Sequence, residues 1–261
     1  MGHSEPNPQL SLVIPAFNEA GRIERGLRPA HAWLSQQPAT FEIVLVDDGS
    51  TDNTAWIVAG FGLRGVRVER IRTNAGKGRA LRHGISRATG AIIVTCDADF
   101  STPVWEIPRI VAAISSGADV VIASREHPDT TIPRDQHPVR KGMGRMFNRL
   151  VRLLTRLPYA DTQCGFKGFR GPVARELYAL ARIDGFATDV EILVLAREAG
   201  RVVEEIPVEW AHVADSRVRL LRHPSQMFGD LVQIALAARA ARRGSVNHDS
   251  KLTRERPIKR G

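Results

Sequence analysis

The chain has 261 residues, enough to bury the core of one large α/β domain, and its 43% hydrophobic and 25% charged content is that of an ordinary globular protein. No apolar run approaches the ~18 residues of a membrane-spanning helix, and the first nine residues lack the apolar core of a signal peptide. We therefore expect a cytoplasmic protein whose two cysteines, Cys96 and Cys164, stay reduced.

The net charge of +9 is concentrated in two segments. Residues 140–156 contain six Lys or Arg and no acid, and residues 217–261 contain eleven Lys or Arg and three acids, so the remainder carries −5 (+9 overall against +14 in the two segments). This distribution predicts a specific anionic partner: nucleic acid, an anionic membrane or a phosphorylated lipid. With only 6% aromatic residues and no recognisable nucleic-acid-binding module, we do not expect nucleic acid.

Apolar segments of strand and helix type alternate in units of about 30 residues. The expected strands are 10–15, 41–46, 66–71, 91–96, 119–123 and 202–210, and the expected helices are 18–36, 53–61, 79–88, 105–115, 142–157, 172–180, 188–198 and 226–243. The alternation predicts one α/β domain with a mostly parallel central sheet flanked by helices. We place this domain at residues 10–243, after a disordered N-terminus (1–9) and before a flexible basic tail (244–261); residues 126–137 are expected to form a mobile loop.

Two carboxylates, Asp97 and Asp99, directly follow the apolar run 91–96. Ligands collect outside the carboxyl ends of parallel strands, and two hard oxygen ligands two positions apart suit Mg²⁺ or Mn²⁺ held jointly with a substrate's phosphates. The alternative is that both are ordinary loop or helix-capping residues, because Asp is favoured between a strand and a helix. The spacing alone does not separate these two interpretations.

Three loops that follow successive strands should lie along one edge of the sheet, at Asp47-Asp48, Gly76-Lys77-Gly78 and Asp97-Ala98-Asp99. Together they offer acceptors for a base and ribose, a cation near phosphates, and a metal site, which a bound nucleotide requires. The second loop is not a Walker A motif, because Ile71 stands where its first glycine would be and no Ser or Thr follows the lysine. No G-x-G-x-x-G follows the first strand, which argues against a dinucleotide oxidoreductase.

Four motifs, in this order and spacing, resemble the family 2 glycosyltransferases of GT-A fold: IPAFNE (14–19), VDDGS (46–50), NAGKG (74–78) and DAD (97–99). The resemblance covers most of residues 10–235 and implies a Rossmann-like sheet in a single domain with a basic C-terminal helix. Further segments are similar to the polyprenyl-phosphate members, particularly the dolichyl-phosphate β-glucosyltransferases: 124–125, 161–167, 189–191 and 210–216. The dolichyl-phosphate mannosyltransferases are a second match.

The resemblance also implies a role for each residue that matches a family motif. The nucleotide-sugar donor would be held by Pro15, Ala16, Phe17, Glu19, Val46, Asp48, Lys77, Asp97, Ala98, Asp99, Gln163 and Arg217. Asp97 and Asp99 would bind the metal and Arg125 and Arg140 the acceptor phosphate, and these four would form the catalytic machinery. Phe17 stands where Tyr is common, and His212 or Val213 stands near the position of an Arg that reaches the donor phosphates in the mannosyl branch.

The implied reaction is inverting transfer of a hexose, glucose from UDP-glucose, onto a polyprenyl phosphate at the cytoplasmic face of a membrane, with Mg²⁺ or Mn²⁺ as cofactor. A phosphomonoester is already ionised at pH 7, since its second pKa is about 6, so it needs no strong general base. The basic amphipathic helix 142–157 would pack its apolar face on the core, rest on an anionic membrane, or do both.

Three other activities stay open at this stage. One is mannose transfer from GDP-mannose, and another is a family 2 enzyme with a soluble hydroxyl acceptor, for which Asp161 or Asp189 would serve as the base. The third is a related nucleotidyltransferase, but such an enzyme usually has a Gly-rich loop after the first strand, and residues 15–19 do not form one. The oligomeric state is not predicted.

Overall fold

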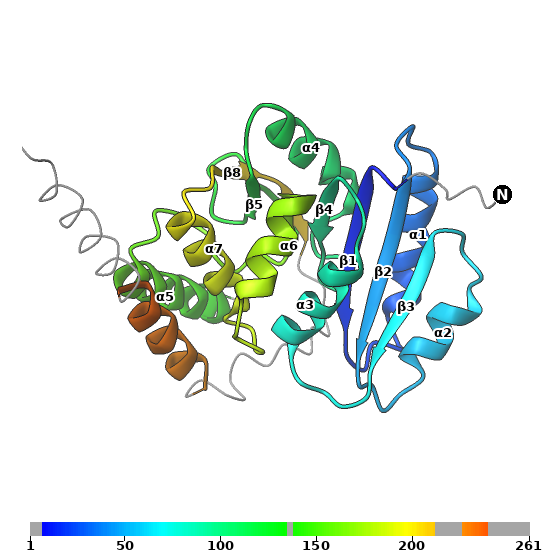
Figure 1. Cartoon of the computed structure of the whole chain (residues 1–261), viewed down its shortest axis with the longest axis horizontal. Helices are drawn as coiled ribbons and strands as arrows, with labels where there is room; N and C mark the ends of the chain where they lie inside the picture. Colours follow the sequence, from blue (N-terminus) through cyan, green and yellow to red (C-terminus); the bar gives the residue numbers. More distant parts are fainter. Residues whose placement is uncertain (1–6, 135–137, 212–225, 240–261) are drawn as a thin grey trace, which may run out of the picture.

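The computed structural model describes residues 7–134, 138–211 and 226–239. Its main feature is one central sheet with helices packed on both faces (Figure 1). The strands of this sheet are β1 (Leu10–Ala16), β2 (Phe41–Asp48), β3 (Val66–Ile71), β4 (Ile92–Thr95), β5 (Val120–Ser124), β7 (Lys167–Arg170) and β8 (Val203–Pro207). They are arranged in the order β3-β2-β1-β4-β7-β5-β8. All neighbours are parallel except β7, which is antiparallel to both β4 and β5.

Helices cover both faces of the sheet. They are α1 (Ile23–Ser35), α2 (Thr54–Gly60), α3 (Lys77–Arg87), α4 (Ile107–Ser115), which follows a short 3₁₀ turn η1 (Val104–Glu106), α5 (Pro138–Thr155), α6 (Gly171–Leu180) and α7 (Thr188–Glu198). Residues 226–239 are also helical. In β1, Val13 belongs to the core beneath α3, whereas Leu12 and Ile14 belong to the core on the opposite face. Because successive strand residues face opposite ways, continuously apolar strands such as β1 and β2 are buried on both faces.

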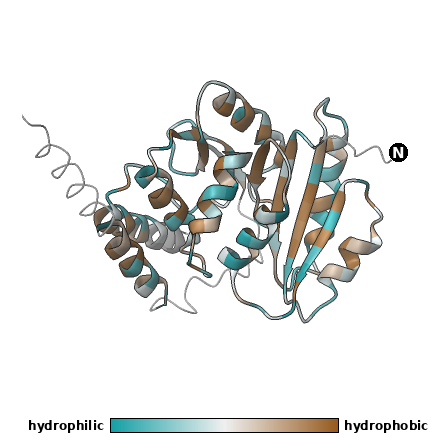
Figure 2. Cartoon of the chain, in the orientation of Figure 1, coloured by the Kyte–Doolittle hydropathy of each residue, from teal (hydrophilic) through white to brown (hydrophobic). Residues whose placement is uncertain are grey.

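Strand order places the natural ligand position. The chain runs from β1 to β2 and β3 on one side, then returns to β4 on the other side of β1. At such a reversal, open α/β sheets bind ligands in a crevice outside the carboxyl ends of the strands, here those of β1 and β4, and we call this region the crevice. In Figure 2 the central strands β1 and β2 are mostly hydrophobic, whereas the edge strand β3 has hydrophilic stretches, in keeping with its partial exposure.

The predicted mostly parallel sheet is confirmed, and three local predictions are wrong. Helix α1 begins at Ile23 rather than near Asn18, because Asn18 adopts the left-handed backbone conformation (φ 56°), which ends regular structure there. Residues 126–137 are not simply a loop, since β6 (Thr131–Arg134) pairs in parallel with β9 (Glu209–Ala211). The expected strand 202–210 is therefore divided between β8 and β9, which belong to different sheets.

Strand β7 was not expected at all, because it has four residues and two of them are charged.

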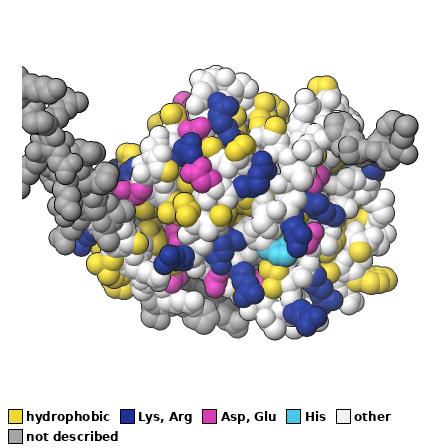
Figure 3. Space-filling view, viewed as in Figure 1, with side chains coloured by type: hydrophobic (Ala, Val, Ile, Leu, Met, Phe, Trp, Pro, Cys, Tyr) yellow, Lys and Arg dark blue, Asp and Glu magenta, His cyan; other side chains and the backbone are white. Residues whose placement is uncertain are grey.

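Among the described residues no helix is long and apolar enough to span a bilayer. Most of the predicted N-terminal segment and all of the predicted tail lie outside the described residues. On the face shown in Figure 3, Lys and Arg side chains are scattered among acidic and apolar ones rather than gathered into one patch.

Candidate active site

The loops after β1 and β2 are joined through Asn18. Its Oδ1 accepts hydrogen bonds from the N–H groups of Thr51 (2.8 Å) and Asp52 (3.3 Å), and its own N–H donates to Ser50 Oγ (2.8 Å). Asn tolerates the left-handed conformation better than most residues because its short side chain bonds locally to backbone. The two loops thus form one continuous wall of the crevice.

Asp48, at the end of β2, fixes the loop that follows β3. Its carboxylate accepts hydrogen bonds from the N–H of Gly76 (2.7 Å), the N–H of Ala75 (3.1 Å) and the Nδ2 of Asn74 (3.0 Å). Burial raises the pKa of Asp48 despite these hydrogen bonds, and the residue is 3% exposed. The carboxylate therefore positions the start of α3, and Lys77 with it.

Lys77 joins this loop to the end of β4. Its ammonium lies 2.9 Å from Asp97 Oδ1 and 2.8 Å from Asp189 Oδ2. Burial alone would lower the pKa of Lys77, but the two carboxylates outweigh burial and raise it. Burial would likewise raise the pKa of Asp97, but the ammonium groups of Lys77 and Lys167 hold it below its usual value. The predicted convergence of the three loops is therefore present in the structure as direct contacts.

Arg125, after β5, forms a two-point ion pair with Asp161. The guanidinium Nε and Nη2 lie 2.6 Å and 2.9 Å from the two carboxylate oxygens, and the backbone N–H of Arg125 donates to the same carboxylate at 3.0 Å. Burial opposes ionisation of Asp161, but Arg125 outweighs it and lowers the pKa of Asp161 to about 2. Fork-to-fork pairing fixes direction as well as distance, so the guanidinium is held rigidly.

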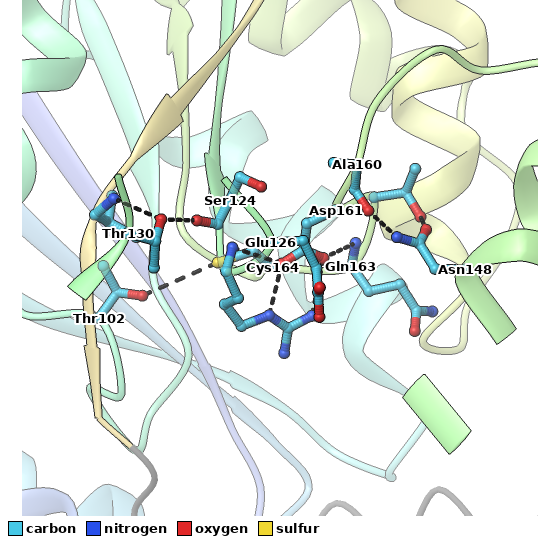
Figure 4. Close-up of polar contacts among 12 residues, drawn as sticks. Thr102, Ser124, Glu126, Thr130, Asn148, Ala160, Asp161, Gln163 and Cys164 are labelled. Atoms are coloured by element: carbon cyan, nitrogen blue, oxygen red, sulfur yellow. Dashed lines mark hydrogen bonds and ion pairs between the residues drawn. The ribbon is translucent and has the colours of Figure 1, made fainter. Parts of the chain in front are cut away.

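The loop that carries Asp161 is fixed by contacts from two more elements, β8 and α5. The N–H groups of Ala160 and Asp161 donate to Glu205 of β8 at 2.9 Å and 2.8 Å. Asn148 of α5 donates to the Ala160 carbonyl and accepts from the Thr162 hydroxyl (3.0 Å). The side chain of Gln163 extends away from this network, leaving its amide for another partner (Figure 4).

Asp97 and Asp99 fit a divalent cation by their donor chemistry. Both are partly exposed, and Asp99 Oδ1 also accepts the N–H of Ser101 at 3.0 Å. The backbone of Gly165 passes so close that an added Cβ would lie 2.2 Å from Asp97 Oδ2. Burial raises the pKa of the neighbouring Cys96 and Cys164 thiols, which leaves oxygen as the available donor. The described residues hold no group of three or more His, Cys, Asp or Glu suited to a metal, so further ligands would come from water and substrate.

The other residues predicted to bind the nucleotide sugar lie at the ends of β1 and β2 and in the loops that follow β1 and β4. Pro15 and Ala16 end β1, and Phe17 follows with 40% of its surface exposed. Glu19 is mostly buried and pairs with Arg22 through Nη2 at 2.6 Å, while the Val46 side chain is fully buried beneath α3. Ala98 is buried between Asp97 and Asp99.

Two predicted cations cannot be placed, and several polar residues of the site were not predicted. Arg140 lies in α5, but its side chain, like the whole of Arg217, lies outside the described residues. Glu205 and Asn148 had no signal of their own in the sequence, and Lys167 was included only as the last residue of the segment 161–167, without a role. Lys167 is fully buried within a strand of the sheet, where a lysine is uncommon without a partner.

Comparison with known proteins identifies the family of this chain. The family model described as glycosyl transferase family 2 matches residues 11–178. The chain belongs to this family. It is 34% identical over 242 residues to a dolichyl-phosphate beta-glucosyltransferase of Trichomonas vaginalis, covering 88% of this chain and 72% of the relative. It is 32% identical over 244 residues to the Drosophila melanogaster protein of that name, covering 88% and 75%. This glycosyltransferase is therefore an enzyme of the class that the sequence motifs indicated.

Solved structures confirm the GT-A fold. Glucosyl-3-phosphoglycerate synthase from Mycobacterium tuberculosis, in complex with Mn²⁺, UDP and phosphoglyceric acid, superposes with a TM-score of 0.68 at 20% identity, covering 87% of this chain and 78% of that one. The Staphylococcus aureus protein TarS, residues 1–349, gives a TM-score of 0.57 at 18% identity, with 88% and 65% covered. At these identities the likeness establishes the fold alone.

Proposed function

We propose that this glycosyltransferase moves glucose from UDP-glucose onto a polyprenyl phosphate of dolichyl type, with inversion at the anomeric carbon. The relatives that are 32–34% identical over most of both chains carry the name dolichyl-phosphate beta-glucosyltransferase. The arrangement of charges at the crevice supports this acceptor class independently.

The observation that carries the proposal is the state of the two carboxylates that a hydroxyl acceptor would need as bases. Asp161 is 2% exposed, and both of its oxygens are bound by Arg125. Asp189 is 3% exposed, with one oxygen bound by Lys77 and the other by Lys167. Neither is placed to take a proton from a hydroxyl group. A phosphomonoester needs no such base, because it is already ionised near neutral pH.

Arg125 is suited to receive that phosphate. Its Nε and Nη2 are engaged by Asp161, while its Nη1 makes no hydrogen bond to any described residue. We assign Arg125 and Arg140 to the acceptor phosphate, where they would offset the repulsion between two anionic substrates and hold the nucleophile in line.

For the donor, we assign the crevice residues implied by the family motifs. The nucleotide sugar would be held by Pro15, Ala16, Phe17, Glu19, Asp48, Lys77, Ala98, Gln163 and Arg217, whereas Val46, which is fully buried beneath α3, would support the crevice from the core without touching the substrate. Asp97 and Asp99 would hold Mg²⁺ or Mn²⁺, as the Mn²⁺–UDP complex of the structural neighbour suggests for a fold of this type. The bound cation would stabilise negative charge on the departing diphosphate.

A membrane surface supplies the acceptor, and α5 is suited to meet it. Its inner side is held by fully buried Val151 and Thr155, whereas Met146 and Leu153 are 68% and 76% exposed. Exposed arginines accompany them at positions 145, 149, 152 and 156. In Figure 1 the helix 226–239, with exposed Phe228 and Leu236, lies at the same end of the molecule. We propose that this end binds the anionic inner face of the membrane, with apolar and cationic contributions together.

A donor comparison tests the proposal. Purified enzyme is incubated with polyprenyl phosphate and Mn²⁺, with radiolabelled UDP-glucose or GDP-mannose, and the lipid extract is counted. We expect labelled glucose in the lipid fraction with wild-type protein and none with Asp99→Ala. Mannose transfer in place of glucose would assign the enzyme to the mannosyl branch, and no lipid product from either donor would contradict the proposed acceptor.

A further inference from the structure

Four side chains of alternating charge, Asp97, Lys77, Asp189 and Lys167, form a row that runs from the site into the core. Lys77 lies between Asp97 and Asp189, at 2.9 Å and 2.8 Å, and Lys167 binds the other oxygen of Asp189 at 2.6 Å. The side chains of Lys77, Asp189 and Lys167 are 10%, 5% and 0% exposed, whereas Asp97 is 45% exposed. Asp97 is therefore the member of this row that is most open to a ligand from the crevice.

The fold places Lys77 in this row of charges rather than exposed to solvent. Lys77 is the first residue of α3, and Asp189 lies in the first turn of α7. The two helix starts touch at Gly78, where an added Cβ would lie 2.1 Å from the Ile183 carbonyl and 2.9 Å from Thr188 Cβ. A lysine is unfavourable at a helix N-terminus, where the backbone already carries partial positive charge. Its position is therefore explained by its two carboxylate partners and not by helix stability.

The four charges of this row cancel. Two ammonium groups face two carboxylates, so Asp97 is already compensated before any metal ion arrives, and Asp99 supplies the remaining negative charge. Among the described residues, Lys77 is the one ion-paired partner of Asp97. A divalent cation approaching Asp97 meets an ammonium on the same carboxylate, and the described part of the chain offers no third acidic, His or Cys ligand.

We propose that Lys77 is a positioning residue that competes with the metal ion for Asp97, and that Asp189 and Lys167 hold it there. Metal binding then depends on the nucleotide, because a diphosphate adds the negative oxygens that the protein lacks. Lys77 keeps the Asp97 carboxylate oriented while the site is empty and restrains the cation from binding without its substrate. The inference rests on the proposed function in one respect, the assignment of Asp97 and Asp99 as metal ligands.

The test is Mn²⁺ binding to nucleotide-free protein, measured from the signal of free Mn²⁺ in electron paramagnetic resonance. Removing the competing charge with Lys77→Met should tighten Mn²⁺ binding by about tenfold, since it leaves Asp189 and Lys167 paired with each other. Asp189→Asn should weaken binding, because two lysines then face Asp97 alone. Lys77→Arg should stay near wild type, and Arg87→Met, which removes an exposed charge from the same helix, serves as the matched control.

Mn²⁺ binding should tighten in Lys77→Met and weaken in Asp189→Asn. A purely structural role of these residues would not change Mn²⁺ affinity in opposite directions. Circular dichroism melts identify any variant that fails to fold, and Lys77→Gln then replaces Lys77→Met. Unchanged or weaker Mn²⁺ binding after neutralising Lys77 would overturn the inference. If wild-type protein binds no Mn²⁺ even with UDP or GDP present, or if Asp97→Asn and Asp99→Asn bind it as well as wild type, the metal site of the proposed function fails as well.

Discussion

Arg125 and Asp161 form a bidentate ion pair between the end of β5 and the loop that follows α5, with N···O distances of 2.6 Å and 2.9 Å. The pair holds a guanidinium at the crevice before any acceptor is bound. Groups fixed in advance stabilise charge without reorganising at the moment of reaction. Because Arg125 binds both oxygens of Asp161, the same pair also opposes a role for Asp161 as a base.

The stability of the folded chain should carry a signature of this pair. The pKa of Asp161 is about 2 in the folded protein and about 3.9 in an unfolded chain, so the pair stabilises the fold fully above about pH 4 and progressively less as the pH falls to 2. We expect Asp161→Asn to lower the free energy of unfolding by about 2 kcal/mol at pH 7. Urea unfolding at several pH values measures this, and a difference that is unchanged at pH 2.5 would contradict it.

The geometry of the guanidinium should matter beyond its charge. Arg125→Lys keeps the positive charge but loses the planar fork that binds Asp161 at two points. We expect kcat/KM for the lipid acceptor to fall by at least about tenfold, while affinity for the nucleotide is unchanged. Arg109→Lys is the matched control, because Arg109 is an exposed arginine that pairs with Glu106 and makes no contact with the residues of the candidate site described above. Equal loss of nucleotide affinity in Arg125→Lys would place this residue on the donor side.

Gly165 should be required for the position of Asp97. A methyl group there would lie 2.2 Å from the carboxylate, so Gly165→Ala must displace Asp97 or the loop. We expect transfer activity to fall by at least about a hundredfold, because small displacements of catalytic groups cost that much. Gly60→Ala, where the added Cβ meets nothing within 4 Å, provides the control. Near-normal activity of Gly165→Ala would show that the position of Asp97 is not critical.

Membrane binding should depend on the exposed face of α5. We expect the double variant Met146→Glu, Leu153→Glu to lose flotation with vesicles that contain anionic phospholipid, because it removes apolar contact and adds repulsion. Trp56→Glu alters a side chain that is 75% exposed on α2 and should float as wild type does. Equal loss in both proteins, or no loss in either, would exclude α5 as the membrane contact.

Elements dominated by local apolar pattern were predicted closely. Strand β3 and helix α7 have the bounds expected from the sequence, and the apolar run before Asp97 is β4. Strand β7 was missed because its identity comes from pairing with β4 and β5 on both sides and not from its own composition. Lys167 within it has the appearance of a surface lysine until its partner is known.

The candidate site was predictable to the extent that its residues follow strands. The positions of Asp48, Lys77 and Asp97 at one sheet edge follow from the order of the motifs. The pairing of Lys77 with Asp189 does not, because 112 positions separate them and no local pattern relates the starts of α3 and α7. For the same reason Asp161 and Asp189 stood as possible bases until their partners Arg125, Lys77 and Lys167 were located.

The most direct test of the central claim compares acceptors that differ only in the phosphate. Wild-type enzyme, UDP-glucose and Mn²⁺ are incubated with polyprenyl phosphate or with the corresponding polyprenol, and lipid-linked glucose is quantified. We expect transfer to the phosphate and none to the alcohol, because Arg125 would offer a cation to an ionised acceptor, whereas the two candidate bases for a hydroxyl acceptor, Asp161 and Asp189, are both held in ion pairs. Comparable transfer to the alcohol, or to a soluble hydroxyl acceptor without any lipid phosphate, would contradict the assignment.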